Sequence, residues 1–141
     1  MTQKEFLDSA IPLLEKIQAT PELQAWCEHY SVYKPERGQP KLSRALSQMM
    51  QDAYAAGIVI TDYQDVIHVS GMGEDAFYRP DPAWVETLGP KQTLAAIAYQ
   101  FRRDHFCEGS LINQAVASGA LLCLFRHLRS LGNGASGQSG Q

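Results

Sequence analysis

The chain has 141 residues, of which 45% are hydrophobic and 19% are charged, with a formal net charge of −3. This composition excludes a largely disordered protein and is typical of one globular domain, long enough to bury roughly two-thirds of its unfolded surface. No apolar run approaches the roughly 18 residues of a membrane span, and the first residues lack the apolar core of a secretory signal, so we expect a cytoplasmic protein without a membrane segment.

The N-terminal part of the chain predicts two helical regions. Residues 3–18 place apolar side chains at helical spacing, but Pro12 lacks an amide hydrogen and clashes with the carbonyl group four residues back. We therefore expect a kink there, or two short helices. Residues 20–22 (Thr-Pro-Glu) are a helix start, because they combine a hydroxyl cap, a proline at the first helical position and an acid at the positive end of the dipole. The helix that follows should end near Tyr30.

The middle of the chain is less regular. Residues 31–40 contain two prolines and a glycine and predict a loop, whereas residues 41–56 return to helical spacing, with Gly57 placed as a C-terminal cap. Residues 58–70 contain two short β-branched runs, which predict a short β-hairpin. The alternative for this segment is an extended loop that folds over the helices.

The C-terminal part predicts four further helices and a tail. Residues 81–88 begin with Asp-Pro and form a short helix, and residues 91–105 have apolar side chains at helical spacing. A later helix begins at Ser110, and Gly119 separates it from the last one. Residues 132–141 contain mostly glycine, serine and glutamine and predict a disordered tail.

The predicted fold class is therefore all-α, a single-domain bundle of about five to seven helices over residues 1–131. The cysteines Cys27, Cys107 and Cys123 are odd in number, widely spaced and without a C-x-x-C pair, so we expect reduced thiols rather than disulfides or a zinc site. Neither a phosphate loop nor a complete dinucleotide fingerprint occurs in the sequence. We expect no metal and no cofactor.

The densest chemistry of the sequence lies in residues 102–109, at the end of a predicted helix. The catalytic candidates are Asp104, His105 and Glu108, because a carboxylate beside an imidazole can tune it for general acid–base work. Their alternative role is structural: a lone histidine on an apolar face is often a hydrogen-bonded core residue, and ion-pair networks imitate active sites.

Two basic side chains precede these candidates. Arg102 and Arg103 are the candidates for binding an anionic ligand. Alternatively, each arginine pairs with an acid across the turn between two helices, which would make the whole segment an architectural corner. Gly109 would let the chain turn sharply there.

The same segment carries a resemblance to a known family. Residues 92–128, with the run Arg102 to Leu111 at the centre and Gly-Ala-Leu-Leu behind it, resemble a bacterial and archaeal domain family of unknown function. Members of that family read Arg-x-Asp-Arg-Phe-x-x-Gly, and this chain departs from the motif at His105, where the family has arginine. The resemblance implies a small, mainly helical intracellular domain, and it supplies no activity.

Two functions remain open at this stage. We favour a regulatory or protein-interaction module that docks a partner protein or associates with itself as a homodimer, because the sequence spells out no catalytic motif. The alternative is a small enzyme or anionic-ligand-binding domain that uses Arg102, Asp104, His105 and Glu108. Nucleic-acid binding ranks third, since no more than two basic residues are adjacent.

Overall fold

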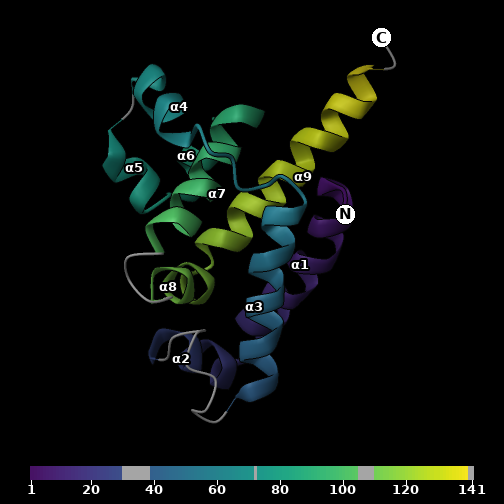
Figure 1. Ribbon diagram of the computed structural model, residues 1–141, viewed down its shortest axis with the longest axis vertical. Helices are drawn as coiled ribbons and strands as arrows, with labels where there is room; N and C mark the ends of the chain where they lie inside the picture. Colours follow the sequence, from purple (N-terminus) through teal and green to yellow (C-terminus); the bar gives the residue numbers. More distant parts are fainter. Residues whose placement is uncertain (30–38, 72, 105–109, 140–141) are drawn as a thin grey trace.

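The computed structural model describes residues 1–29, 39–71, 73–104 and 110–139. These residues contain helices and no β-strand, which confirms the all-α class. In chain order the helices are α1 (Gln3–Ala19), α2 (Pro21–His29), α3 (Pro40–Ala55), α4 (Tyr63–Ser70), α5 (Glu74–Tyr78), α6 (Pro82–Val85), α7 (Pro90–Asp104), α8 (Ser110–Ser118) and α9 (Ala120–Ser139). The long helices α1, α3 and α9 run along one side of the molecule in Figure 1, and α4 to α7 lie on the other.

The predicted number of helices, five to seven, was too low. The described residues form nine, and the additional ones, α4 and α5, come from the segment that the sequence left irregular. A β-hairpin in residues 58–70 was wrong as well, because residues 63–70 are helical. Packing decides here: Ile67 is buried, and the ring of Tyr63 meets that of Tyr99 on α7 edge-on, with 6.3 Å between centroids. The β preference of a short β-branched run is too weak to oppose such contacts.

Helix α1 is continuous through Pro12, so the alternative of two separate helices was wrong. Pro12 and Asp8, the residue whose carbonyl group the proline cannot bond, are both exposed, so water can bond that carbonyl. At its start, Thr2 and Glu5 form a capping box, with side chain and backbone bonded in both directions at 3.1 and 2.9 Å. Hydrogen bonds to the Glu5 carboxyl group, first from the backbone amide of Thr2 and then from its side chain, lower the pKa of that carboxyl group.

The core lies around α7, whose residues 95–101 are all buried. This helix contacts α4, α5, α8 and α9. Phe6 of α1 meets Phe125 of α9 edge-on, with ring centroids 5.3 Å apart, so the N- and C-terminal parts share one core. Within the described residues no helix combines the length and apolarity that crossing a membrane requires.

Several helix ends follow the local signals of the sequence. Asp81 caps α6 by accepting a hydrogen bond from the amide of Ala83 at 3.0 Å, and Gly57 has a φ of 73° after α3. Helix α9 extends to Ser139, across most of the segment for which the sequence predicts a disordered tail. The division of the chain into a domain over residues 1–131 and a tail stays a prediction.

Candidate functional site

The residues that the sequence singled out lie at the end of α7 and just beyond it. Arg102 is exposed on the last turn of α7. Arg103 and Asp104 also belong to α7, but their side chains, together with His105 and Glu108, lie outside the described residues. A convergence of these groups on one pocket therefore stays a prediction, and so does the structural corner.

The described residues form a cleft elsewhere, where α8 ends and α9 begins. It has a volume of about 510 Å³, and we call it the Gln100 cleft. Its walls are the segment between α5 and α6, one residue of α7, the end of α8 and the start of α9. The lining residues are Tyr78 to Pro82, Gln100, Gln114, Ala115, Ser118 to Ala120 and Cys123.

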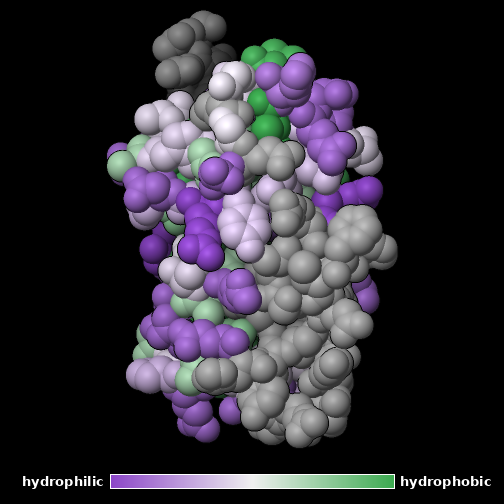
Figure 2. Space-filling view, turned by 90° about the vertical axis from the view of Figure 1, so that its left-hand side faces the viewer, coloured by the Kyte–Doolittle hydropathy of each residue, from purple (hydrophilic) through white to green (hydrophobic). Residues whose placement is uncertain are grey.

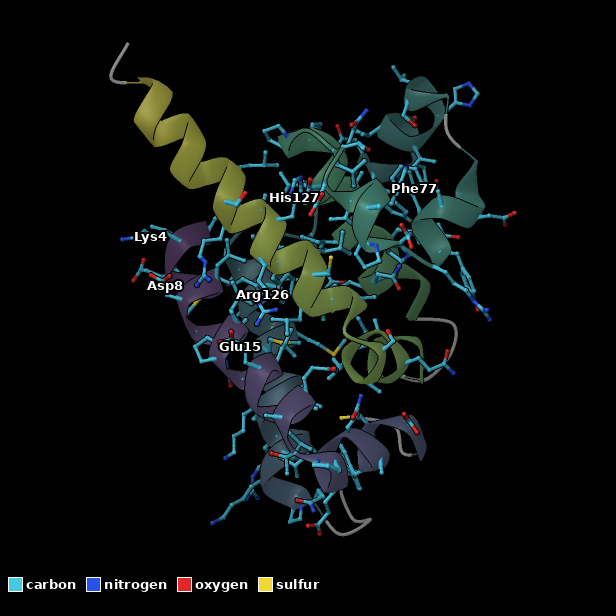
Figure 3. All side chains as sticks on the ribbon, turned by 180° about the vertical axis from the view of Figure 1, so that it is seen from behind. Lys4, Asp8, Glu15, Phe77, Arg126 and His127 are labelled. Carbon is cyan, nitrogen blue, oxygen red and sulfur yellow. The ribbon has the colours of Figure 1, made fainter. Side chains whose placement is uncertain are left out.

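A second hollow of about 790 Å³ adjoins this cleft, and Pro82, Gly119 and Cys123 line both. In the second hollow, Arg126 on α9 forms an ion pair with Glu15 on α1 at 2.6 Å, as Figure 3 shows from behind. His127 Nε2 lies 2.8 Å from the carbonyl oxygen of Leu88, so this nitrogen carries a proton and donates it. Both side chains are thus engaged within the protein.

Gly119 creates the junction at which the two hollows meet. Its φ of 85° is a left-handed conformation that favours glycine, and it turns the chain from α8 into α9. The Gly119 amide donates to the carbonyl of Val116 at 3.3 Å, and its own carbonyl accepts from the amide of Cys123 at 2.9 Å. One residue therefore closes α8 and opens α9.

Gln100 is the polar side chain buried at the base of the cleft, with a relative exposure of 5%. Its Nε2 donates to the carbonyl oxygens of Phe77 at 2.7 Å and Tyr78 at 3.4 Å. Because both partners are acceptors, the amino group must face them, which fixes the orientation of the carboxamide. No described residue donates a hydrogen bond to its Oε1.

The mouth of the cleft carries two charges of opposite sign, Arg79 and Asp81. The guanidinium carbon of Arg79 lies 5.6 Å from the centroid of the Tyr78 ring, a cation–π contact. Asp81 uses one carboxylate oxygen to cap α6. Both residues are exposed, and neither forms an ion pair with a described residue. Packing between the rings of Phe77 and Trp84, with centroids 5.0 Å apart, holds the segment that carries these charges.

The described cysteines are poor nucleophiles. Burial raises the pKa of the Cys123 thiol, the charges of Glu86 and Asp81 raise it further, and Arg126 opposes them. Burial, followed by the charge of Glu28, raises the pKa of the Cys27 thiol to about 11. Both are free thiols, as predicted, whereas Cys107 lies outside the described residues. Because the thiolate is the reactive form, the raised pKa values lower the reactivity of both thiols at neutral pH.

A third hollow, of about 500 Å³, lies between α4 and α7 and is lined by Asp65, Val66, Val69, Ser70, Lys91 and Gln92. Beside it Lys91 pairs with Asp62 at 3.2 Å, with both side chains half exposed. Val69 is 84% exposed. The strongest apolar colour on the face shown in Figure 2 is a small patch near the top. In Figure 1, α4 lies at this end of the molecule.

Among the described residues, no group of histidines, cysteines and acids is arranged to hold a metal ion.

Sequence reasoning missed the residues of the Gln100 cleft. Gln100 lies between Tyr99 and Phe101 in a helix segment that is otherwise apolar, and a polar residue at a core position was the available signal. The run from Arg79 to Pro82, with two prolines around an acid, indicated only a helix start. Nothing in the sequence places that run beside Gln100.

The described residues thus form an all-α fold with a partly polar cleft. A family model described as "Family of unknown function (DUF6508)" matches residues 2–134, and the chain belongs to that family. The match covers far more of the chain than the resemblance seen in the sequence, whose specific motif and bacterial or archaeal origin stay predictions. Comparison with curated proteins and with solved structures finds no match.

Proposed function

We propose that the protein is a small regulatory module that binds a polar ligand in the Gln100 cleft. The observation that carries the proposal is the carboxamide of Gln100, which is 5% exposed and has an oxygen without a donor among the described residues. A buried acceptor without a partner costs about 1–3 kcal/mol. A ligand with an N–H group would remove this cost on binding.

The dimensions of the cleft support binding as well. Its volume of about 510 Å³ lies within the ~300–1,000 Å³ typical of small-molecule sites. Apolar walls from Pro82, Ala115 and Ala120 surround few polar groups, which is how such sites combine affinity with orientation. The walls come from helices packed on a common core, so the site would be largely formed before the ligand arrives.

Docking of a partner protein is the second part of this proposal. Its support is Val69, which is 84% exposed beside the hollow between α4 and α7. The other large apolar side chains exposed on the described surface, Met1 and Tyr54, belong to the N-terminus and to α3. A partner protein or a second copy of the chain would recognise the ligand-bound state. Location in the cytoplasm belongs to the same proposal.

Acetamide is the probe that tests ligand binding, with N,N-dimethylacetamide as its matched control, because only acetamide can donate an N–H to Gln100 Oε1. We expect acetamide to shift the side-chain amide resonances of Gln100 in a saturable way, and N,N-dimethylacetamide to shift them less. Gln48, which bonds to Asp52 on the exposed side of α3, serves as an internal control. The same response in the variant Gln100→Met, read at Ala115 and Ala120, would contradict the proposal.

A further inference from the structure

The Gln100 cleft is lined by a cationic, an anionic and a neutral polar side chain. Arg79 and Asp81, which are exposed, and Gln100, which is 5% exposed and has an Oε1 without a donor among the described residues, line the same cleft. Pro80 separates the two charged residues in sequence, and they form no ion pair with each other. A cation and an anion, neither of them paired with a described residue, therefore lie at one opening.

A ligand with a single charge would satisfy only one of these groups. A simple anion would pair with Arg79 but lie close to the carboxylate of Asp81, and a simple cation would meet the opposite problem. A zwitterion with adjacent charges satisfies both, and its ammonium group has further protons for an uncharged acceptor such as Gln100 Oε1.

We propose that the Gln100 cleft binds a free α-amino acid with an apolar side chain. Its carboxylate pairs with Arg79, and its ammonium group donates to Asp81 and to Gln100 Oε1. The side chain lies against the apolar part of the lining, which Ala115, Ala120 and Cys123 supply. This inference rests on the proposed function, since it names the chemical class of the ligand for the same cleft.

The geometry of the charged groups suits this division of roles. The planar guanidinium can bind a carboxylate through two parallel N–H donors, and the Tyr78 ring beneath it supports its position. Asp81 accepts the α6 capping bond through Oδ2, which leaves the other carboxylate oxygen for an ammonium group. The Cys123 thiol stays protonated because its pKa is raised, so it adds an uncharged surface to the wall.

The test compares three ligands by calorimetric titration of the full chain at pH 7. L-leucine carries both charges, L-leucinamide lacks the carboxylate, and N-acetyl-L-leucine lacks the ammonium group. We expect L-leucine to bind about tenfold or more tightly than either derivative, because each derivative leaves one charged group of the protein without a partner. L-glutamate and L-lysine should bind more weakly than L-leucine, since their side chains would bring a charge to an apolar wall.

Two variants test which residue pairs with each charge of the ligand. Arg79→Met should abolish the preference for L-leucine over L-leucinamide, and Asp81→Asn should abolish the preference over N-acetyl-L-leucine. Asparagine is as good a helix cap as aspartate, so Asp81→Asn removes the charge and keeps the α6 cap. Arg44→Met and Asp75→Asn, at exposed positions of α3 and α5, are the matched controls and should leave both preferences unchanged.

The outcomes separate the ligand class from the site itself. Equal affinities for L-leucine and both derivatives, or preferences that survive Arg79→Met and Asp81→Asn, would overturn the amino-acid proposal. Binding of acetamide at Gln100 without binding of L-leucine would also overturn it, while the proposed function would stand. If neither acetamide nor L-leucine affects Gln100, both proposals fail. Thermal melting of each variant checks that the fold is intact.

Discussion

Gln18 and Gln24 donate side-chain hydrogen bonds to the same backbone oxygen, that of Ala117, each at 2.8 Å. Gln18 also reaches the carbonyl of Val116 at 2.7 Å. These carbonyls belong to the last turn of α8, where a helix leaves its acceptors without partners. Side chains from α1 and α2 thus bond the last carbonyl groups of α8, immediately before the turn at Gly119 that lines the Gln100 cleft.

The first prediction concerns these terminal bonds. Gln18→Met should lower the free energy of unfolding by about 1 kcal/mol, because it removes the hydrogen bonds of Gln18 to Val116 and Ala117 and leaves Val116 only the longer bond from the Gly119 amide. Gln24→Met should cost less, since Gln18 still bonds to Ala117. Urea denaturation followed by circular dichroism measures both values. Gln48→Met, which removes an exposed hydrogen bond within α3, is the control and should change the free energy of unfolding little. An equal loss of stability in all three variants would show that the hydrogen bonds at the α8 terminus contribute no more than an exposed one.

The second prediction concerns the left-handed residue between α8 and α9. Gly119→Ala should destabilise the protein by about 1 kcal/mol, because an L-residue at a φ of 85° is strained. The nearest atom to the new Cβ, Gln18 Oε1, would lie at 3.5 Å, an ordinary contact, so the cost comes from the backbone.

Two variants control this interpretation. Gly119→Asn should cost less than Gly119→Ala, since asparagine tolerates the left-handed region. Gly89→Ala, at a position where an added Cβ meets nothing within 4 Å and φ is not left-handed, should be nearly neutral. If the Gly119→Ala protein melts at the same temperature as the parent, this turn can be made without the left-handed conformation.

Local chemistry explains which parts of the fold the sequence could predict. The starts at Pro21 and Pro82 and the end at Gly57 depend on residues within one helical turn, and these agree with the structure. The conformations at Pro12 and in residues 63–70 depend on the tertiary structure. Pro12 and Asp8 lie on the exposed side of α1, and α7 provides the packing that makes α4 helical. Neither relationship is visible in a short window of sequence.

The same distinction applies to the candidate site. The density of charge in residues 102–109 drew attention because its groups are adjacent in sequence. Gln100 gains its significance only from the carbonyls of Phe77 and Tyr78, more than twenty residues earlier. A site assembled across α5, α7, α8 and α9 has no short motif, so only the fold can reveal it.

The third prediction tests the core around α7. Phe101 is 2% exposed, as the apolar spacing of residues 91–105 predicted, and its ring meets that of Tyr54 with 6.3 Å between centroids. Phe101→Ala should therefore lower the free energy of unfolding by about 3 kcal/mol through the cavity it leaves. Arg102→Ala, at the neighbouring exposed position, should stay within about 0.5 kcal/mol of the parent. Denaturant midpoints at constant m-value provide the comparison, and similar losses for both variants would contradict this orientation of α7.

The last prediction concerns Cys27 and alkaline pH. Burial raises the pKa of its thiol from 9.0 to about 11, so between these values the unfolded chain loses a proton that the folded chain keeps. The unfolded state then binds fewer protons than the native state, and the free energy of unfolding must fall as the pH rises. The stabilising contribution is complete below pH 9 and is lost as the pH rises toward 11.

Cys27→Ala isolates this contribution from the lysines and tyrosines that titrate in the same range. The variant should be less stable than the parent at neutral pH because of the cavity it creates in a fully buried position. Its stability should then decline less steeply above about pH 9, so that the two curves converge. Denaturation in urea under reducing conditions, repeated at increasing pH, measures both slopes. Parallel curves for parent and variant would show that Cys27 ionises as readily in the folded protein as in the unfolded chain, and that the core around α2 admits water.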